Sequence, residues 1–146
     1  MKTTVISVVV AVVAVFATAA VIYLTPLKHI NLIEPVTKDI SPTEFYKRYK
    51  QNPDGYVFVD VRTQSEYEKG HAEGAGNVSL PKFFDGYTQF PKKGKTIVLI
   101  CAGGRESGVG YGYLEHHGYL NLLRIEGGTN QWIVENLPIV KGKELK

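Results

Sequence analysis

The chain has 146 residues, which is enough for one folded domain of ordinary size. Its hydrophobic content of 44% and charged content of 21% are typical of a globular domain, and a formal net charge of +3 is too small to predict a nucleic-acid partner. A single cysteine excludes an intramolecular disulfide and a cysteine-based zinc site, and the scattered histidines predict no bound metal.

Near its N-terminus the chain has an uncharged run at residues 5–24 that is rich in valine and alanine. As a helix this run would be about 30 Å long, the thickness of a bilayer core, so it predicts one N-terminal transmembrane or signal helix. Two interpretations stay open. The small residues Ala17 and Ala19 fit the cleavage site of a signal peptide, whereas the continuation of the apolar run to Leu24 favours an uncleaved signal anchor.

Both interpretations predict a protein that is membrane-anchored or secreted. The positive charge of Lys2 is expected to keep the short N-terminal tail in the cytoplasm, so the domain would lie on the extracytoplasmic side, periplasmic or extracellular. The predicted division is a signal anchor or signal peptide at 1–25, a linker at 26–39 and a folded domain at 40–146.

Helical and strand patterns alternate through the predicted domain. A serine–proline pair at 41–42 and a capping box that begins at Thr63 are typical of helix starts. Further helices are expected after Cys101 and around Trp132. This alternation predicts an α/β fold with a central, mainly parallel sheet covered by helices on both faces. Short apolar segments predict the strands at 56–60, 77–80, 96–100 and 122–125.

Cys101 lies where a reactive thiol would be built. The predicted strand at 96–100 leads directly into it, and a glycine-containing turn at 102–107 separates it from the next helix. This arrangement directs backbone N–H groups at one spot and stabilises a thiolate there, and the thiolate is the nucleophile. Open parallel sheets bind ligands beyond the carboxyl ends of their strands, where Asp60 also lies. The alternative interpretation is a buried structural cysteine.

Three separated stretches, spanning roughly residues 40–140, together resemble the rhodanese family of sulfurtransferases. The active-site loop of that family is similar to residues 101–107, and the form Cys-x-x-Gly-Arg-x-Ser behind an export signal most resembles small exported rhodaneses of the phage-shock type. The residues similar to the first and closing family signatures are Asp60, Val61, Arg62, Glu66, Tyr67, Gly70, His71, Gly74, Ala75, Asn77 and Val78, and then Gly118, Tyr119, Gly127, Gly128 and Trp132.

The resemblance implies a rhodanese-like domain whose Cys101 takes sulfane sulfur from a small donor such as thiosulfate. The sulfur would be held as a persulfide and passed to a thiol or to cyanide, with no cofactor and no metal. Catalysis is therefore assigned to Cys101, and structural support to Asp60, Arg62, Glu66 and His71. The loop residues expected to surround the substrate are Ala102, Gly103, Gly104, Arg105, Glu106 and Ser107.

Local chemistry suggests how some of these residues act. Arg105 is a positive charge suited to an anionic donor, although Glu106 or another surface acid is an alternative ion-pair partner. Glu106 itself opposes anion binding. Ser107 is expected either to cap the helix or to hydrogen-bond the sulfur. A local ion pair is expected between Arg62 and Glu66.

Three other functions compete with sulfur transfer by an enzyme. A non-catalytic, membrane-tethered module that binds or carries persulfide for a partner protein would have the same sequence features. A phosphatase of the related Cdc25 type needs an arginine where this chain has Ser107, and a histidine where it has Ile100. A thioredoxin-like redox protein is disfavoured because there is no second cysteine.

Overall fold

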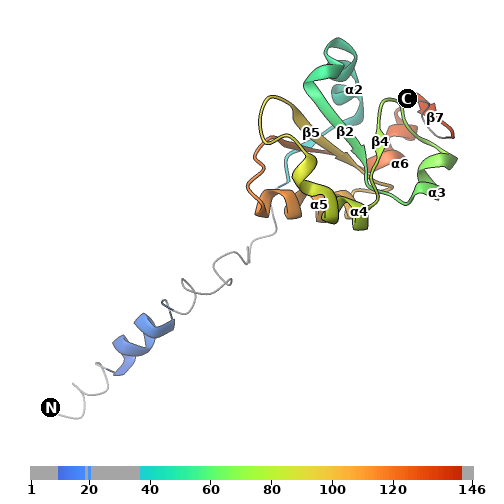
Figure 1. The fold of residues 1–146 in the computed structure, drawn as a ribbon. Helices are drawn as coiled ribbons and strands as arrows, with labels where there is room; N and C mark the ends of the chain where they lie inside the picture. Colours follow the sequence, from blue (N-terminus) through green and yellow to red (C-terminus); the bar gives the residue numbers. More distant parts are fainter. Residues whose placement is uncertain (1–9, 19, 21–36, 143–146) are drawn as a thin grey trace. The chain divides into compact units, whose positions relative to one another are not determined.

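The computed structural model describes residues 10–18, 20 and 37–142, and the chain divides into two units, Met1–Val36 and Thr37–Lys146. Residues 10–18 of the first unit are helical and exposed (Figure 1). Within the described ranges, none of the helices combines the length and apolar character that crossing a bilayer requires. Half of the predicted anchor run at 5–24, and most of the predicted linker at 26–39, lies outside the described residues.

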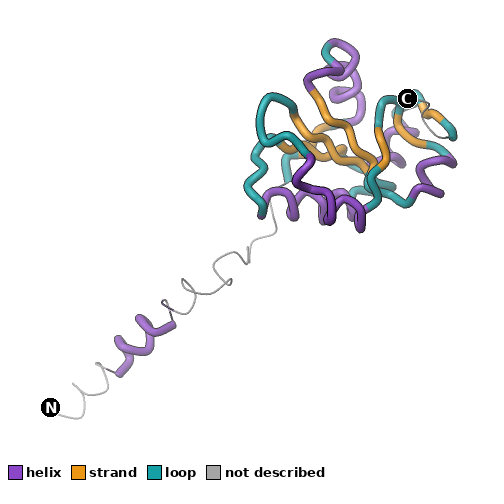
Figure 2. Tube along the Cα trace, viewed as in Figure 1, coloured by secondary structure: helices purple, strands orange, loops and turns teal. Residues whose placement is uncertain are grey.

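The second unit is built on a parallel sheet in the order β1-β6-β5-β2-β4, which confirms the predicted sheet (Figure 2). A separate two-stranded antiparallel ribbon joins β3 to β7. The strands are β1 Asp39–Ile40, β2 Tyr56–Asp60, β3 His71–Ala72, β4 Gly76–Asn77, β5 Thr96–Ile100, β6 Leu122–Ile125 and β7 Ile139–Val140.

Helices cover both faces of the sheet, as predicted, with α4 beside α5 on one face and α2 beside α6 on the other (Figure 1). Strand β5 shows the reason, because its side chains alternate. Leu99 belongs to the core with Phe83 of α4, whereas Val98 belongs to the core with Phe45 of α2 and Trp132 of α6. The helices are α2 Pro42–Gln51, α3 Gln64–Lys69, α4 Leu80–Gly86, α5 Arg105–His116 and α6 Gly128–Val134, with 3₁₀ turns η2 Pro53–Gly55 and η3 Tyr87–Gln89.

Helix capping follows the sequence pattern. The Ser41 hydroxyl accepts the backbone N–H of Glu44 at the start of α2. At the start of α3, Thr63 and Glu66 form the predicted capping box. Both caps satisfy N–H groups that a helix cannot bond internally, so they set where these helices begin.

The predicted strand at 77–80 is wrong at its C-terminal end. Strand β4 ends at Asn77, and α4 begins at Leu80 with Pro81 in its first turn. Proline is tolerated there because the first N–H groups of a helix have no internal partner. The backbone N–H of Val78 reaches Asp60 and that of Leu80 reaches Val61, so the chain follows β2 before turning into the helix.

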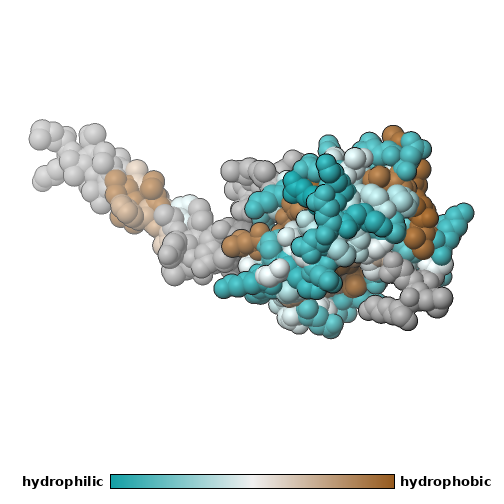
Figure 3. All heavy atoms as spheres, turned by 90° about the horizontal axis from the view of Figure 1, so that it is seen from above, coloured by the Kyte–Doolittle hydropathy of each residue, from teal (hydrophilic) through white to brown (hydrophobic). Residues whose placement is uncertain are grey.

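The surface of the second unit is mostly polar. Hydrophilic side chains cover most of the face seen from above, and apolar ones gather in smaller areas (Figure 3). Large apolar side chains of this unit that are more than half exposed are Val109, Leu120, Ile133 and Val134. Scattered exposed apolar residues of this kind are normal for a folded domain.

Candidate active site around Cys101

Cys101 follows β5 directly and is only 1% exposed, within a core cluster that includes Leu99 and Tyr111. Its Sγ accepts the backbone N–H of Gly104 at 3.1 Å and donates to the hydroxyl of Ser107 at 3.4 Å. The thiol is therefore buried and at the same time surrounded by polar groups of the loop. A sulfur with this environment is better suited to carrying negative charge than one packed only against apolar atoms.

Gly104 organises the loop. It has φ +97°, a left-handed conformation that favours glycine, and it is the N-cap residue of α5. Its carbonyl oxygen accepts three donors, namely the Ser107 hydroxyl at 3.1 Å, the Gly108 N–H at 3.0 Å and the Arg124 guanidinium at 3.0 Å. Of the two roles expected for Ser107, its side chain contacts the sulfur and does not cap the helix.

The N-terminus of α6 holds the loop from the other side. The carbonyl oxygen of Cys101 accepts both the N–H and the hydroxyl of Thr129, at 2.8 and 3.1 Å, and that of Ala102 accepts the N–H of Asn130. At Gly128, which has φ +61°, a Cβ would lie 2.3 Å from the Cys101 carbonyl oxygen. Close backbone approach therefore explains why a glycine stands here, and Thr129 is a loop contact that the sequence analysis did not find.

Asp60 and Arg62 form a buried ion pair beside the site. Asp60 is fully buried and accepts the N–H, Nε and Nη2 of Arg62, the last at 2.6 Å, while Arg62 also donates to the Gly70 carbonyl. Burial alone would lower the pKa of Arg62, but hydrogen bonding and charge attraction from Asp60 outweigh it and raise that pKa, with a smaller contribution from the Glu66 carboxylate.

This pair corrects one expectation. The hydrogen-bonded partner of Arg62 is Asp60 and not Glu66, because the Glu66 carboxylate is occupied in the capping box with Thr63. His71 is fully buried in β3, where its Nδ1 lies 2.9 Å from the Tyr67 carbonyl oxygen and its ring stacks on the Tyr67 ring. These contacts agree with supporting roles, which remain predictions.

The two charged loop residues face solvent. Arg105 and Glu106 are exposed in the first turn of α5, and across residues 37–142 neither takes part in an ion pair. The alternative partner expected for Arg105 is therefore not engaged. Both charges stay available to a substrate that approaches the loop, one attracting an anion and the other repelling it.

Arg124 is a site contact that the sequence analysis missed. It lies on β6, donates to the Gly104 carbonyl and forms a two-pronged ion pair with Asp39. A signal was present, since Arg124 is the one charged residue in the otherwise apolar segment 122–125. A charged side chain inside a buried strand requires a partner, and sequence spacing does not reveal which.

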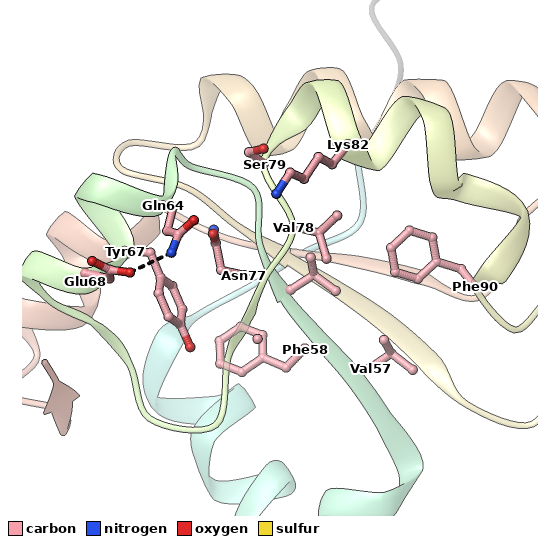
Figure 4. A pocket seen from close by; sticks show the side chains of 12 residues that line it. Val57, Phe58, Gln64, Tyr67, Glu68, Asn77, Val78, Ser79, Lys82 and Phe90 are labelled. Atoms are coloured by element: carbon pink, nitrogen blue, oxygen red, sulfur yellow. Dashed lines mark hydrogen bonds between the residues drawn. The ribbon is translucent and has the colours of Figure 1, made fainter. Parts of the chain in front are cut away.

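No cluster of three or more histidine, cysteine, aspartate or glutamate side chains suited to a metal ion occurs among the described residues. A groove of about 550 Å³ lies elsewhere, between α3, α4 and the β2–β4 edge of the sheet, with Lys82 on one side and Glu68 on the other (Figure 4). It does not include Cys101 or its loop. The residues that line it are Val57, Phe58, Val59, Gln64, Tyr67, Glu68, Gly76, Asn77, Val78, Ser79, Lys82 and Phe90.

Solved structures share this architecture. A rhodanese-related protein from Thermoplasma volcanium has a TM-score of 0.61 at 27% identity, covering 70% of this chain and 97% of that one. A rhodanese-like domain protein from Staphylococcus aureus has a TM-score of 0.59 at 29% identity, covering 66% and 91%.

Curated relatives extend the comparison. The tRNA uridine(34) hydroxylase of Bdellovibrio bacteriovorus is 34% identical over 110 residues, covering 70% of this chain and 30% of that protein. That of Photorhabdus laumondii is 35% identical over 114 residues, covering 68% and 31%. The chain thus spans about a third of the length of the curated relatives it matches. The family described as the rhodanese-like domain matches residues 41–135, well over half of the sequence, and this chain belongs to that family.

Proposed function

We propose that this protein is a rhodanese-type sulfurtransferase that takes sulfane sulfur from a donor such as thiosulfate onto Cys101 and passes it to a thiol or to cyanide. One observation carries the proposal. The only thiol of the chain lies at the carboxyl end of β5, inside a loop that already donates a backbone N–H to its sulfur. Membership of the rhodanese-like family supports it.

The chemistry balances without a redox cofactor. The Cys101 thiolate attacks the outer sulfur of thiosulfate, an S–S bond forms, and the S–S bond of the donor breaks so that sulfite leaves with the electron pair. In the second step the acceptor thiolate or cyanide attacks the outer sulfur of the persulfide. That step releases an acceptor persulfide or thiocyanate and restores the Cys101 thiolate, so one nucleophile divides the transfer into two displacements.

The loop supports each anionic species in turn. The Gly104 N–H and the N-terminal end of the 12-residue helix α5 favour negative charge at the sulfur. The small residues Ala102 and Gly103 are more exposed than Cys101 and leave room for a donor at the mouth of the loop. Arg105 is available to attract that donor, and Glu106 limits how strongly an anion binds.

A second candidate function is a persulfide carrier that serves a partner protein without turning over small donors. The burial of Cys101 favours it, and so does the charge of Glu106, which forms no ion pair within residues 37–142, because both slow the approach of a free anion. Hydroxylation of tRNA, the activity in the names of the curated relatives, is not part of our proposal, because this chain covers about 30% of those proteins.

We also propose that residues 5–24 direct the domain across a membrane and either anchor it or are cleaved. Fractionation of cells that produce the full chain, with protease added from outside the cytoplasmic membrane, tests this. Degradation of the domain by the external protease is expected. A domain that stays protected in the cytoplasm would contradict the proposal.

The test of sulfur transfer is the intact mass of the full-length protein with and without thiosulfate, for the wild type and for Cys101→Ser. A gain of one sulfur atom by the wild type alone, removed by cyanide, is expected. Repeated thiocyanate release indicates the enzyme, and a single release indicates the carrier. If the wild type gains no sulfur from thiosulfate or from other sulfane donors, the sulfurtransferase proposal fails.

A further inference from the structure

Arg124 lies on β6 and contacts the Cys101 loop at Gly104. Its Nη1 donates to the Gly104 carbonyl oxygen at 3.0 Å, and its Nε and Nη2 donate to the two carboxylate oxygens of Asp39 at 2.8 and 2.5 Å. Asp39 and Arg124 are register partners on β1 and β6. The guanidinium therefore donates one hydrogen bond to the loop and two to the neighbouring strand of the sheet.

The contact with Gly104 bears on the sulfur through the backbone. The peptide before the Gly104 Cα carries the N–H that reaches Cys101 Sγ, and the peptide after it carries the carbonyl held by Arg124. Since Gly104 has φ +97° and glycine is conformationally free, a contact from outside the loop adds to the Ser107 and Gly108 hydrogen bonds in keeping the two planes in this orientation. Of the three donors to that carbonyl, Arg124 is the only charged one, so its hydrogen bond is the strongest.

Arg124 is itself bound to Asp39 by two hydrogen bonds. Hydrogen bonding to Arg124 lowers the pKa of Asp39, and hydrogen bonding to Asp39 raises the pKa of Arg124 against the effect of burial. Gly108 fits the same geometry, because a Cβ there would lie 3.0 Å from Arg124 Nη1. A side chain at that position requires the guanidinium to shift by a few tenths of an ångström against its contact with Gly104.

We propose that Arg124, fixed by Asp39, is a positioning residue for the sulfur-transfer loop. It holds Gly104 in the left-handed conformation that directs its N–H at Cys101, and its charge favours anions at the thiol. We refer to these two residues as the Asp39–Arg124 brace. The inference deepens the proposed function, because it concerns the same thiol.

Other charged side chains lie near the same loop, and a test of Arg124 must leave them unchanged. Arg62 lies at the end of β2 and is paired with Asp60, and Arg105 and Glu106 lie on the first turn of α5. Helix α6, which packs against the loop, contains no charged residue. A change at Arg124 alone leaves all of these groups in place.

The experiment is alkylation of the full-length protein by neutral iodoacetamide and by anionic iodoacetate. Because Cys101 is the only cysteine, every alkylated thiol reports on this site. Arg124→Gln is expected to slow iodoacetamide about tenfold, from the loss of one charge-assisted hydrogen bond. It is expected to slow iodoacetate by a further factor of about three, from the loss of one positive charge near the sulfur.

Three variants separate the effects. Arg124→Lys keeps the charge without the two-pronged geometry, so it is expected to restore the iodoacetate-to-iodoacetamide ratio but not the absolute rates. Gly108→Ala keeps all charges and displaces the guanidinium, so it is expected to slow both reagents by the same factor. Arg48→Gln removes an exposed arginine paired with Glu44 and is the matched control, with wild-type rates expected.

Wild-type alkylation rates in folded Arg124→Gln would overturn the proposal. The proposal would also fail if Arg124→Gln lost the same factor in rate with both reagents and Arg124→Lys showed the same loss. If Arg124→Gln does not fold, Asp39→Asn and Gly108→Ala carry the test, and wild-type rates in both would overturn it. Alkylation needs no sulfur transfer. A wild type that alkylates as described but takes no sulfur from any donor therefore defeats the proposed function and leaves the brace standing.

Discussion

At the scale of single residues, the site depends on a position that has no side chain. Gly128 brings the backbone of α6 against the carbonyl groups of Cys101 and Ala102, so that Thr129 and Asn130 can donate to them. Its positive φ and this close approach impose two separate requirements for glycine. Each of these two features alone disfavours a side chain at position 128. The hydrogen bonds that the close approach permits join the loop to helix α6.

Gly128→Ala is therefore expected to destabilise the protein by about 3 kcal/mol or more, from left-handed strain plus overpacking, and to slow persulfide formation at Cys101. Gly94→Ala is the matched control, since Gly94 also has a positive φ but nothing within 4 Å of a Cβ. It is expected to cost about 1 kcal/mol from strain alone and to leave Cys101 unaffected. Urea unfolding and intact mass after thiosulfate measure both; equal costs for the two variants would contradict the packing argument.

At the scale of secondary-structure elements, caps decide where the short helices begin. Helix α3 has a complete capping box, whereas Ser79 at the start of α4 makes no side-chain cap hydrogen bond. The two N-cap residues therefore have similar chemistry and different contacts. Helix α3 is six residues long, and a helix that short depends strongly on its ends.

Thr63→Ala is expected to cost about 1 kcal/mol of unfolding free energy, because it removes the side-chain acceptor of the Glu66 N–H and the hydroxyl that donates to the Glu66 carboxylate. Ser79→Ala is expected to cost much less, because no hydrogen bond is lost. Chemical denaturation of the two variants under the same conditions checks this difference. A larger loss for Ser79→Ala than for Thr63→Ala would show that the caps do not control these helix ends.

At the scale of the whole molecule, the Asp39–Arg124 brace joins residues 85 positions apart in the sequence. The pKa of Asp39 lies below its ordinary value of 3.8, mainly because Arg124 hydrogen-bonds the carboxylate. A lowered folded-state pKa means that the stabilisation is present above pH 3.8 and is lost as the pH falls through the folded value. Its size is limited, since the Asp39 side chain is 31% exposed.

Asp39→Asn is therefore expected to lower the Tm by roughly 4 °C at pH 7, corresponding to at most about 1 kcal/mol. The difference from the wild type is expected to shrink as the pH falls below about 4, where the wild-type carboxylate is protonated too. Thermal unfolding of both proteins from pH 7 down to pH 3 measures it. A difference that stays constant over this range would show that the carboxylate charge is not the source.

Local sequence signals predicted much of the fold. The segments 56–60, 96–100 and 122–125 are strands, and the caps at Ser41 and Thr63 are where their patterns indicated. These features depend on near neighbours in the chain, such as a hydroxyl and the N–H three residues later. The wrong prediction at 77–80 also came from a local signal, because an apolar run before a proline is compatible with both a strand end and a helix start.

The sequence by itself determined the family, the mainly parallel α/β fold and the placement of the single cysteine at the end of a strand before a glycine-containing loop. Only the tertiary structure decided which distant groups hold that loop. Arg124 reaches Gly104 from β6, Thr129 reaches Cys101 from α6, and Asp60 takes Arg62 in preference to Glu66. The physical reason is that the choice of partner depends on which strand ends meet in space. The number of residues between β1, β5 and β6 in the sequence does not reveal how far apart these strands lie.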